Sequence, residues 1–390
     1  MPGFELVGEE EKKAVMDVFD KGGVFYRYGL NERRQNIFRV DEFEKKVAQR
    51  MKTRFALFVC NGTAALKLAL IAAGVKETDE VILPSFTFIA TIEAVLEIGA
   101  IPVIAEIDRS LNMDPVDLAK KISPKTKAIV PVHMAGVPAK MDEILSIAKK
   151  HGLAVIEDSA QAMGATYKGK CLGTLGLAGV YSTDQGKIIT SGEGGILVTD
   201  NEQIYLTARE YADHGHEQNP KFPRGEDTRT IWGFNYKITE LQGAIAQVQL
   251  AKMDHILLKQ RENKKKIKDG ISKAPGLEFR ELPDAAGDAS DTLIFMVDSR
   301  EKASSFAKKL SQKGLGTKNL PDAVNWHYAG TWTHIFYNYP QYKGKDLEKV
   351  WSQSTGYLRR SVALPIMVMM DDDRINFIIE AVNEIAKELA

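Results

Sequence analysis

Residues 182–195 of this chain read STDQGKIITSGEGG. This stretch places a lysine, Lys187, inside a turn-rich segment that ends in glycines. Upstream, residues 157–162 read EDSAQA and residues 61–66 read NGTAAL. A lysine, an upstream acid and a Gly-Thr turn that opens an apolar run together predict a site for a phosphorylated ligand that carries an aldehyde.

The chemistry of each part supports this interpretation. A deprotonated lysine amine, such as that of Lys187, can form an imine with an aldehyde. A carboxylate such as Asp158 can face a pyridine nitrogen and keep it protonated, so that the ring withdraws electrons. Gly62 and Thr63 open a helical run, where backbone N–H groups and the helix dipole favour a phosphate. These features predict pyridoxal phosphate as the cofactor, with Lys187 and Asp158 as catalytic residues.

Length and composition limit the class of protein. The chain has 390 residues, enough for two or three domains or for one large domain with a smaller partner. Basic and acidic residues balance at 52 each, so no long-range field attracts nucleic acid or an anionic membrane. Residues 1–12 lack the pattern of a secretion signal, and no apolar run reaches membrane-spanning length. We therefore expect a cytoplasmic protein with a small substrate and neither a nucleic acid nor a membrane partner.

Residues 55–199 alternate short β-branched runs with longer amphipathic ones, which is typical of parallel strands joined by crossover helices. The predicted strands are 55–59, 80–83, 101–105, 128–132, 154–157, 180–182 and 196–198. The predicted helices are 64–73, 89–98, 115–122 and 141–151. Asn61, Asp158 and Ser182 fall at or just past strand ends, where ligands of α/β sheets collect. These side chains are therefore predicted to converge.

The alternation of predicted strands and helices does not continue into the last third of the sequence. A long helix at 239–261 is predicted to lead out of a large α/β domain, residues 1–250. Residues 251–390 are predicted to form a small α+β domain, with strands at 277–282 and 292–297 and helices at 301–313 and 371–389. The lysine run 264–266 is predicted to be a solvated helix face.

Five segments, residues 61–66, 84–91, 157–162, 187–195 and 233–242, resemble the DegT/DnrJ/EryC1/StrS sugar aminotransferases. That family has the aspartate aminotransferase fold (fold type I). The resemblance implies an α/β fold with a large, mixed, mostly parallel sheet and a small α+β C-terminal domain. It also implies a pyridoxal phosphate-dependent transaminase that passes through pyridoxamine phosphate. Glutamate would be the amino donor, and a keto or aldehydo sugar would be the acceptor.

The resemblance gives roles to the residues around the cofactor ring. Lys187 would bond to the cofactor and move the proton during transfer. Asp158 would pair with the pyridine nitrogen, and Gln161 would lie near the ring hydroxyl. Phe88 would stack on the ring, an offset aromatic contact worth about 0.5–1.5 kcal/mol beyond burial.

The resemblance also gives roles to residues at the phosphate. Gly62, Thr63 and Ser182 would hold it within one subunit. Asn235 would reach it from the neighbouring subunit. The smallest active unit would then be a homodimer with two shared active sites.

Four further residues are candidate substrate contacts: Glu193, His214, His216 and His327. Glu193 lies in the glycine-rich turn, where a bare turn is the alternative. His214 and His216 are one residue apart without an adjacent cysteine or acid triad, so hydrogen bonds or substrate contact are favoured over a metal site, and no metal is expected. His327 belongs to an Asn-Trp-His-Tyr segment suited to a sugar, and a packed turn of the small domain stays open there.

The acceptor is the least constrained prediction. Residues 1–6, Asp184, residues 213–216 and residues 325–328 resemble the branch of the family that aminates C8 of 3-deoxy-manno-octulosonate for lipopolysaccharide. This would imply a free 8-oxo sugar acid as acceptor. Thr183, Lys237 and the absence of a histidine after Leu364-Pro365 depart from the usual family residues at positions that face the acceptor.

Three alternative hypotheses remain beside this one. The chain could aminate a nucleotide-linked 4-keto- or 3-keto-6-deoxy sugar. It could be a pyridoxamine-dependent sugar dehydratase, although those relatives carry a histidine where Lys187 stands here. It could also be a non-catalytic cofactor-binding regulator, which would be expected to lose Lys187 or Asp158.

Overall fold

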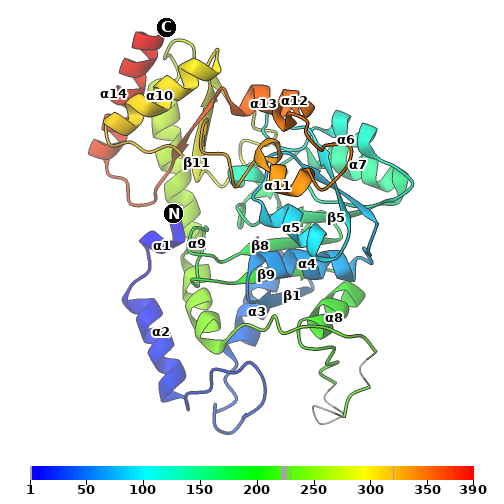
Figure 1. The fold of residues 1–390 in the computed structure, drawn as a ribbon. Helices are drawn as coiled ribbons and strands as arrows, with labels where there is room; N and C mark the ends of the chain where they lie inside the picture. The colour runs from blue at the N-terminus through cyan, green and yellow to red at the C-terminus, as the bar shows by residue number, and fades with distance from the viewer. Residues whose placement is uncertain (1, 220, 222–225, 229, 319) are drawn as a thin grey trace.

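The computed structural model describes residues 2–219, 221, 226–228, 230–318 and 320–390. Its centre is a seven-stranded sheet in the order β1-β9-β8-β5-β4-β2-β3 (Figure 1). In chain order the strands are β1 (Phe55–Val59), β2 (Glu80–Pro84), β3 (Ile101–Ala105), β4 (Thr126–Ile129), β5 (Ala154–Asp158), β8 (Ala178–Ser182) and β9 (Gly195–Thr199). The predicted α/β fold with a mixed, mostly parallel sheet is confirmed.

Strand β9 is the exception to the parallel pattern, because it runs antiparallel to both β1 and β8. The expectation that crossover helices join all these strands is wrong here. Residues 183–194 return the chain directly from β8 to β9, and an antiparallel return needs no crossover. Strand β4 also ends earlier than the predicted strand 128–132, and Val132 keeps only an isolated bridge to Asp158.

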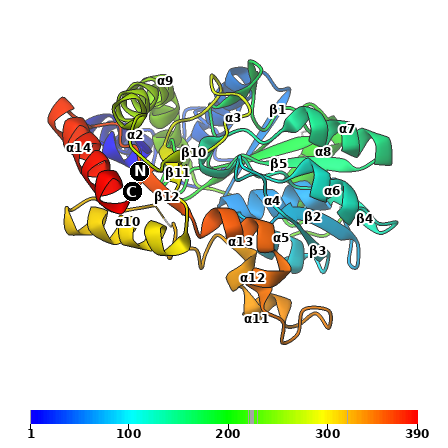
Figure 2. The same ribbon diagram turned by 90° about the horizontal axis from the view of Figure 1, so that it is seen from above.

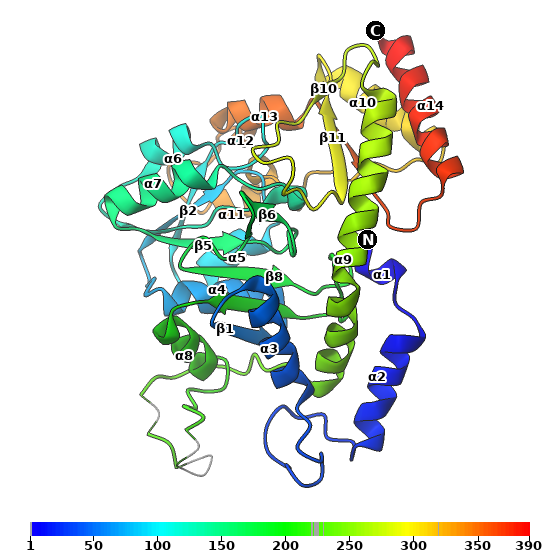
Figure 3. The same cartoon turned by 180° about the vertical axis from the view of Figure 1, so that it is seen from behind.

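Helices cover both faces of the sheet (Figures 1 and 3). Successive strand residues face opposite sides, so Phe58 packs in one hydrophobic cluster and Leu57 in the other. The cluster that contains Leu57 includes residues from α4 (Gly62–Ala72), α5 (Ala90–Glu97) and α8 (Glu202–Tyr211). The cluster that contains Phe58 includes residues from α3 (Arg39–Met51), α6 (Pro115–Lys121), α7 (Met141–His151) and α9 (Glu240–Ile271).

Helix α9 links the two parts of the molecule. It runs from beside α3 in the large part up to the small C-terminal sheet, and α1 (Pro2–Glu5) and α2 (Glu9–Asp20) lie along it (Figures 1 and 3). It is continuous across residue 250 and ends ten residues later than predicted, at Ile271 instead of 261. The domain division at residue 250 stays a prediction.

The C-terminal part is a three-stranded sheet with two long helices (Figure 2). Its elements are β10 (Glu278–Phe279), β11 (Thr292–Met296), β12 (Ser361–Pro365), α10 (Arg300–Gln312) and α14 (Asp372–Leu389). Short elements complete the chain: β6 (Thr166–Tyr167), β7 (Lys170–Cys171), α11 (Thr333–Phe336), α12 (Leu347–Val350), α13 (Ser352–Leu358), and the 3-10 turns Met134–Gly136 and Ala329–Thr331. The predicted strand 277–282 is much shorter, and β12 was not predicted.

A separate apolar cluster joins the large and small parts. Phe86, Met134 and Val132 from the large part pack with Ile294 and Ala363 from the small sheet. The pocket described below opens beside this junction. None of the helices formed by the described residues is both long and apolar enough to span a bilayer.

One prediction about the surface of α9 is wrong. Lys264 is buried, with a side chain only 8% exposed, and its ammonium pairs with the buried carboxylate of Asp288. Lys265 and Lys266 are exposed, as predicted. Lys264 faces inward because the loop around Asp288, from the small part, covers that side of α9.

Candidate active site

Three predicted site residues lie at one edge of the large sheet. Asp158 is the last residue of β5, Ser182 is the last residue of β8, and Asn61 follows β1 as the N-cap of α4. Because β1, β5 and β8 are parallel, their carboxyl ends lie at the same edge. The predicted convergence of Asn61, Asp158 and Ser182 is therefore observed.

Lys187 sits in a tight turn between β8 and β9. Its backbone N–H donates to the Asp184 carbonyl at 3.1 Å, and the Asp184 carboxylate accepts from Gly186 N–H at 2.9 Å. The Thr183 and Ser191 hydroxyls, on the two arms of the turn, lie 2.7 Å apart. These bonds hold the turn in one shape, so the position of the Lys187 backbone is fixed.

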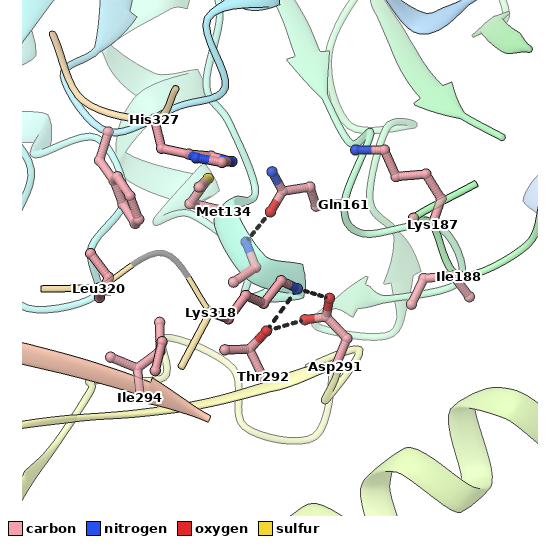
Figure 4. A pocket seen from close by; sticks show the side chains of 14 residues that line it. Met134, Gln161, Lys187, Ile188, Asp291, Thr292, Ile294, Lys318, Leu320 and His327 are labelled. Atoms are coloured by element: carbon pink, nitrogen blue, oxygen red, sulfur yellow. Dashed lines mark hydrogen bonds and ion pairs between the residues drawn. The ribbon is translucent and has the colours of Figure 1, made fainter. Parts of the chain in front are cut away.

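The Lys187 side chain lines a pocket between the two parts of the molecule (Figure 4). Burial lowers the pKa of its amine, and the carboxylates of Asp184 and Asp158 only partly oppose that effect. A lysine amine that loses its proton more readily is a better nucleophile and a better base.

Asp158 is a buried carboxylate that is held by short hydrogen bonds. It accepts from the Thr91 hydroxyl at 2.7 Å and from Ala160 N–H at 3.1 Å. Burial raises its pKa, while Thr91, Ala160 and the charge of Lys187 act in the opposite direction. A carboxylate in this setting gains from a cationic partner, which is what a protonated pyridine nitrogen would provide.

The start of α4 forms a narrow cradle beside β8 and β9. A methyl group on Gly62 would lie 3.1 Å from Cβ of Ser182, and one on Gly195 would lie 2.1 Å from the Asn61 carbonyl oxygen. Glycine is therefore required at residue 195, where two backbones touch. Thr63 follows Gly62 in the first turn of α4, where the Asn61 side chain accepts from Ala64 N–H and the helix dipole favours an anion.

Of the two predicted ring contacts, only Gln161 lines the pocket, whereas Phe88 lies beside the pocket residue His327. Gln161 lines the pocket, and its side-chain oxygen accepts from Ala135 N–H at 3.0 Å. The Phe88 ring is 40% exposed and lies 5.3 Å from the His327 ring. An aromatic ring left open at a pocket edge can cover a planar ligand.

The candidate substrate residues fall into two groups. The first group is His327, which lines the pocket with Lys187, and Glu193, whose pKa the charge of Lys187 lowers. Partial burial of the Glu193 carboxyl and the like charge of Asp184 outweigh that effect and raise its pKa. His214 is exposed, and His216 pairs with Asp227 at 3.0 Å. Neither histidine of that second group lines this pocket.

Asn235 also lies outside the pocket of its own chain. It is exposed on the segment between α8 and α9 and makes an isolated β-bridge with Asp213. Lys237 pairs with the buried Asp213 carboxylate.

Residues that the sequence did not indicate complete the pocket. Lys318, Asp291 and Thr292 come from the small part and line the wall on that side of the junction (Figure 4). Thr91, which holds Asp158, lies within one of the recognised segments but had no predicted role. No motif marks Lys318 or Asp291, because the fold alone brings them to Lys187.

The residues present fit pyridoxal phosphate. A reactive amine, a buried carboxylate and an anion cradle at a helix start are the three contacts that its aldehyde, ring nitrogen and phosphate need. The described residues contain no cluster of three or more His, Cys, Asp or Glu side chains that could hold a metal ion.

Comparisons with known proteins found a family model, related sequences and similar solved structures. A family model described as the DegT/DnrJ/EryC1/StrS aminotransferase family matches residues 28–383. The chain is 32% identical over 388 residues to the spore coat polysaccharide biosynthesis protein SpsC of Bacillus subtilis, covering 98% of this chain and 96% of that protein. It is 30% identical over 349 residues to GDP-perosamine synthase of Escherichia coli O157:H7, covering 88% and 89%. An aminotransferase structure from Psychrobacter cryohalolentis superposes with a TM-score of 0.86 at 28% identity, covering 98% of each chain.

Proposed function

Because this chain belongs to the DegT/DnrJ/EryC1/StrS aminotransferase family, we propose that it moves an amino group from glutamate to the carbonyl carbon of a sugar. It is a sugar aminotransferase, and pyridoxal phosphate is its cofactor. When bound, this cofactor supplies an electron sink for carbanion chemistry. The observation that carries the proposal is the convergence of Lys187, Asp158 and the Gly62–Ser182 cradle at one edge of the sheet.

In this proposal the catalytic residues act through proton transfer and charge. Lys187 holds the resting cofactor and, once freed by the amino donor, moves a proton at the donor's Cα. Its lowered pKa supports that role, since a base works best when its pKa lies near the working pH. Asp158 keeps the ring nitrogen protonated, and Thr91 holds the Asp158 carboxylate in place.

The remaining predicted residues bind and orient. Gly62, Thr63 and Ser182 bind the phosphate, Gln161 lies at the ring hydroxyl, and Phe88 covers the ring. Glu193 and His327 contact the substrate. The open face of Phe88 and the pocket position of Gln161 support these roles.

We place Asn235 at the phosphate of a neighbouring subunit, which makes the active unit a homodimer. Its exposure supports this placement, as does the exposed apolar surface around it, where Trp232 is 70% and Phe234 is 47% exposed. Exposed aromatic side chains of this size are typical of protein interfaces. His214 and His216 belong to the segment that would enter the neighbouring site with Asn235.

For the acceptor, a nucleotide-linked keto sugar is better supported than a free sugar acid. The relatives matched over most of the chain include a GDP-perosamine synthase. A free 8-oxo sugar acid, 8-oxo-3-deoxy-manno-octulosonate, is kept as the second candidate because the pocket holds a cationic side chain, Lys318, beside Lys187.

The test is a spectral one. Glutamate added to the purified, cofactor-loaded protein should shift its near-visible absorbance band to that of pyridoxamine phosphate and release 2-oxoglutarate. A panel of nucleotide-linked keto sugars and free oxo sugar acids is then added, and the true acceptor should restore the first band. If glutamate produces no shift, the proposed reaction is wrong; if only a free sugar acid restores the band, the second acceptor replaces the first.

A further inference from the structure

On the side of the small sheet, the wall of the pocket carries one partly exposed ammonium group, that of Lys318. Lys318 is anchored by its backbone N–H, which donates to the Ala363 carbonyl on β12 at 2.7 Å. Its side chain is 35% exposed and lines the same pocket as Lys187 and Gln161 (Figure 4). Lys318 therefore reaches the pocket from a loop of the small part that is bonded to β12.

Hydrogen bonds hold the ammonium of Lys318 in place but occupy only part of its N–H donors. It donates to the Asp291 carboxylate at 2.5 Å and to the Thr292 hydroxyl at 3.0 Å. An ammonium has three N–H donors, so these two bonds leave one donor. Asp291 is buried, with a side chain 8% exposed, whereas Lys318 is open, so the charge that a ligand meets here is positive.

The surroundings of Lys318 suit an organic acid. The adjacent wall is apolar, with Ile294, Leu320 and Ala363 lining it. A cation in an apolar wall complements a carboxylate on a short carbon chain, because the carbon chain covers the wall and the acid takes the open donor. The cofactor phosphate has its own cradle at the start of α4, so Lys318 is not needed for it.

We propose that Lys318 binds a carboxylate group of the substrate and is a specificity-determining residue of this site. The inference rests on the proposed function, because it takes the pocket beside Lys187 as the place where substrates bind. Two substrates can supply the carboxylate: the amino donor, or an acceptor that is a sugar acid. Asp291 and Thr292 position the ammonium, and neither is required to touch the ligand.

The direct test measures binding without turnover. Titration calorimetry with glutarate on the cofactor-loaded protein should show Lys318→Met binding roughly 10- to 100-fold more weakly than the wild type, the usual effect of losing a charge-assisted hydrogen bond. Lys318→Arg should recover part of the affinity. Lys313→Met is the matched control, because Lys313 is 33% exposed, pairs with Glu384 at 2.8 Å and does not line the pocket.

The kinetic arms distinguish the source of the carboxylate. If the donor supplies it, Lys318→Met should raise the glutamate concentration at half-saturation of the absorbance shift by the same factor. If the acceptor supplies it, the loss should appear with 8-oxo-3-deoxy-manno-octulosonate and not with a GDP-linked keto sugar. Equal glutarate affinity of wild type and Lys318→Met, together with an equal response of both to 8-oxo-3-deoxy-manno-octulosonate, with both proteins folded and cofactor-loaded, would overturn the inference. If the wild type binds glutarate but shows no absorbance shift on addition of glutamate, the proposed function is contradicted instead.

Discussion

At the residue scale, His327 shows how the pocket sets charge. Burial and the nearby ammonium groups of Lys187 and Lys318 lower its pKa to about 4. Its Nδ1 atom is buried and has no hydrogen-bond partner among the described residues. A neutral imidazole with one buried, unpartnered ring nitrogen therefore lines the same pocket as Lys187.

The low pKa of His327 predicts acid sensitivity of the cofactor-free chain. The unfolded residue takes up a proton near pH 6.5, whereas the folded one does so only near pH 4. The contribution of neutral His327 to the free energy of unfolding is therefore complete above pH 6.5 and is lost as the pH falls from 6.5 to 4. Between pH 7.5 and 5, the wild type should lose about 1–2 kcal/mol more free energy of unfolding than His327→Asn.

Urea unfolding of the cofactor-free forms at the two pH values measures this difference. Lys187 must be free of cofactor, because its charge is one cause of the shift. If both proteins lost the same free energy of unfolding, His327 would not be buried beside the two ammonium groups.

Residues that belong to short motifs could be predicted as site candidates from the sequence. Lys187, Asp158 and the Gly62-Thr63 turn are such residues, because the residues next to them in the chain indicate the same chemistry. Lys318 and Asp291 could not, since they are 131 and 104 positions beyond Lys187 and meet it only through the packing of two sheets.

At the element scale, the alternating strands and helices of residues 55–199 were predictable from their hydrophobic period. The reversal of β9 was not, because its five residues are all buried and read the same in either direction. The short strand β10 could not be placed either, since two residues carry too little pattern. For helix α9, the spacing of apolar residues predicts a helix. It does not predict the burial of Lys264, because the loop that covers Lys264 lies elsewhere in the chain.

The buried ion pair between Lys264 and Asp288 gives a prediction for α9. Replacing Lys264 with Met leaves a buried carboxylate without its cation, which should cost about 3 kcal/mol in free energy of unfolding. The matched control is Lys265→Met, which removes an exposed pair with Asp269 and should cost less than about 0.5 kcal/mol. Urea unfolding compares the two variants, and equal small losses would show that Lys264 is solvated after all.

At the scale of the whole molecule, the proposal requires two chains for each active site. Lys187 and Asn235 would then belong to the same site but to different subunits. A dimer of Lys187→Ala with Asn235→Ala would contain one site with both residues intact.

Subunit exchange tests this arrangement. Each variant alone should be weak or inactive, and an equimolar mixture should recover up to roughly a quarter of wild-type turnover, since half of the dimers are mixed and each has one intact site. Activity of the mixture is measured by amino transfer to the acceptor that restores the absorbance band. A mixture no more active than the average of its components would place Asn235 outside the neighbouring site.

We propose that the cofactor is attached covalently to the protein through the amine of Lys187. The most direct measurement is borohydride reduction of the cofactor-loaded protein, followed by peptide mass spectrometry of every lysine. We expect one phosphopyridoxyl group per chain, on Lys187, and none in Lys187→Ala. A modification on another lysine such as Lys318, or an unmodified Lys187 in a protein that still transfers amino groups, would contradict it.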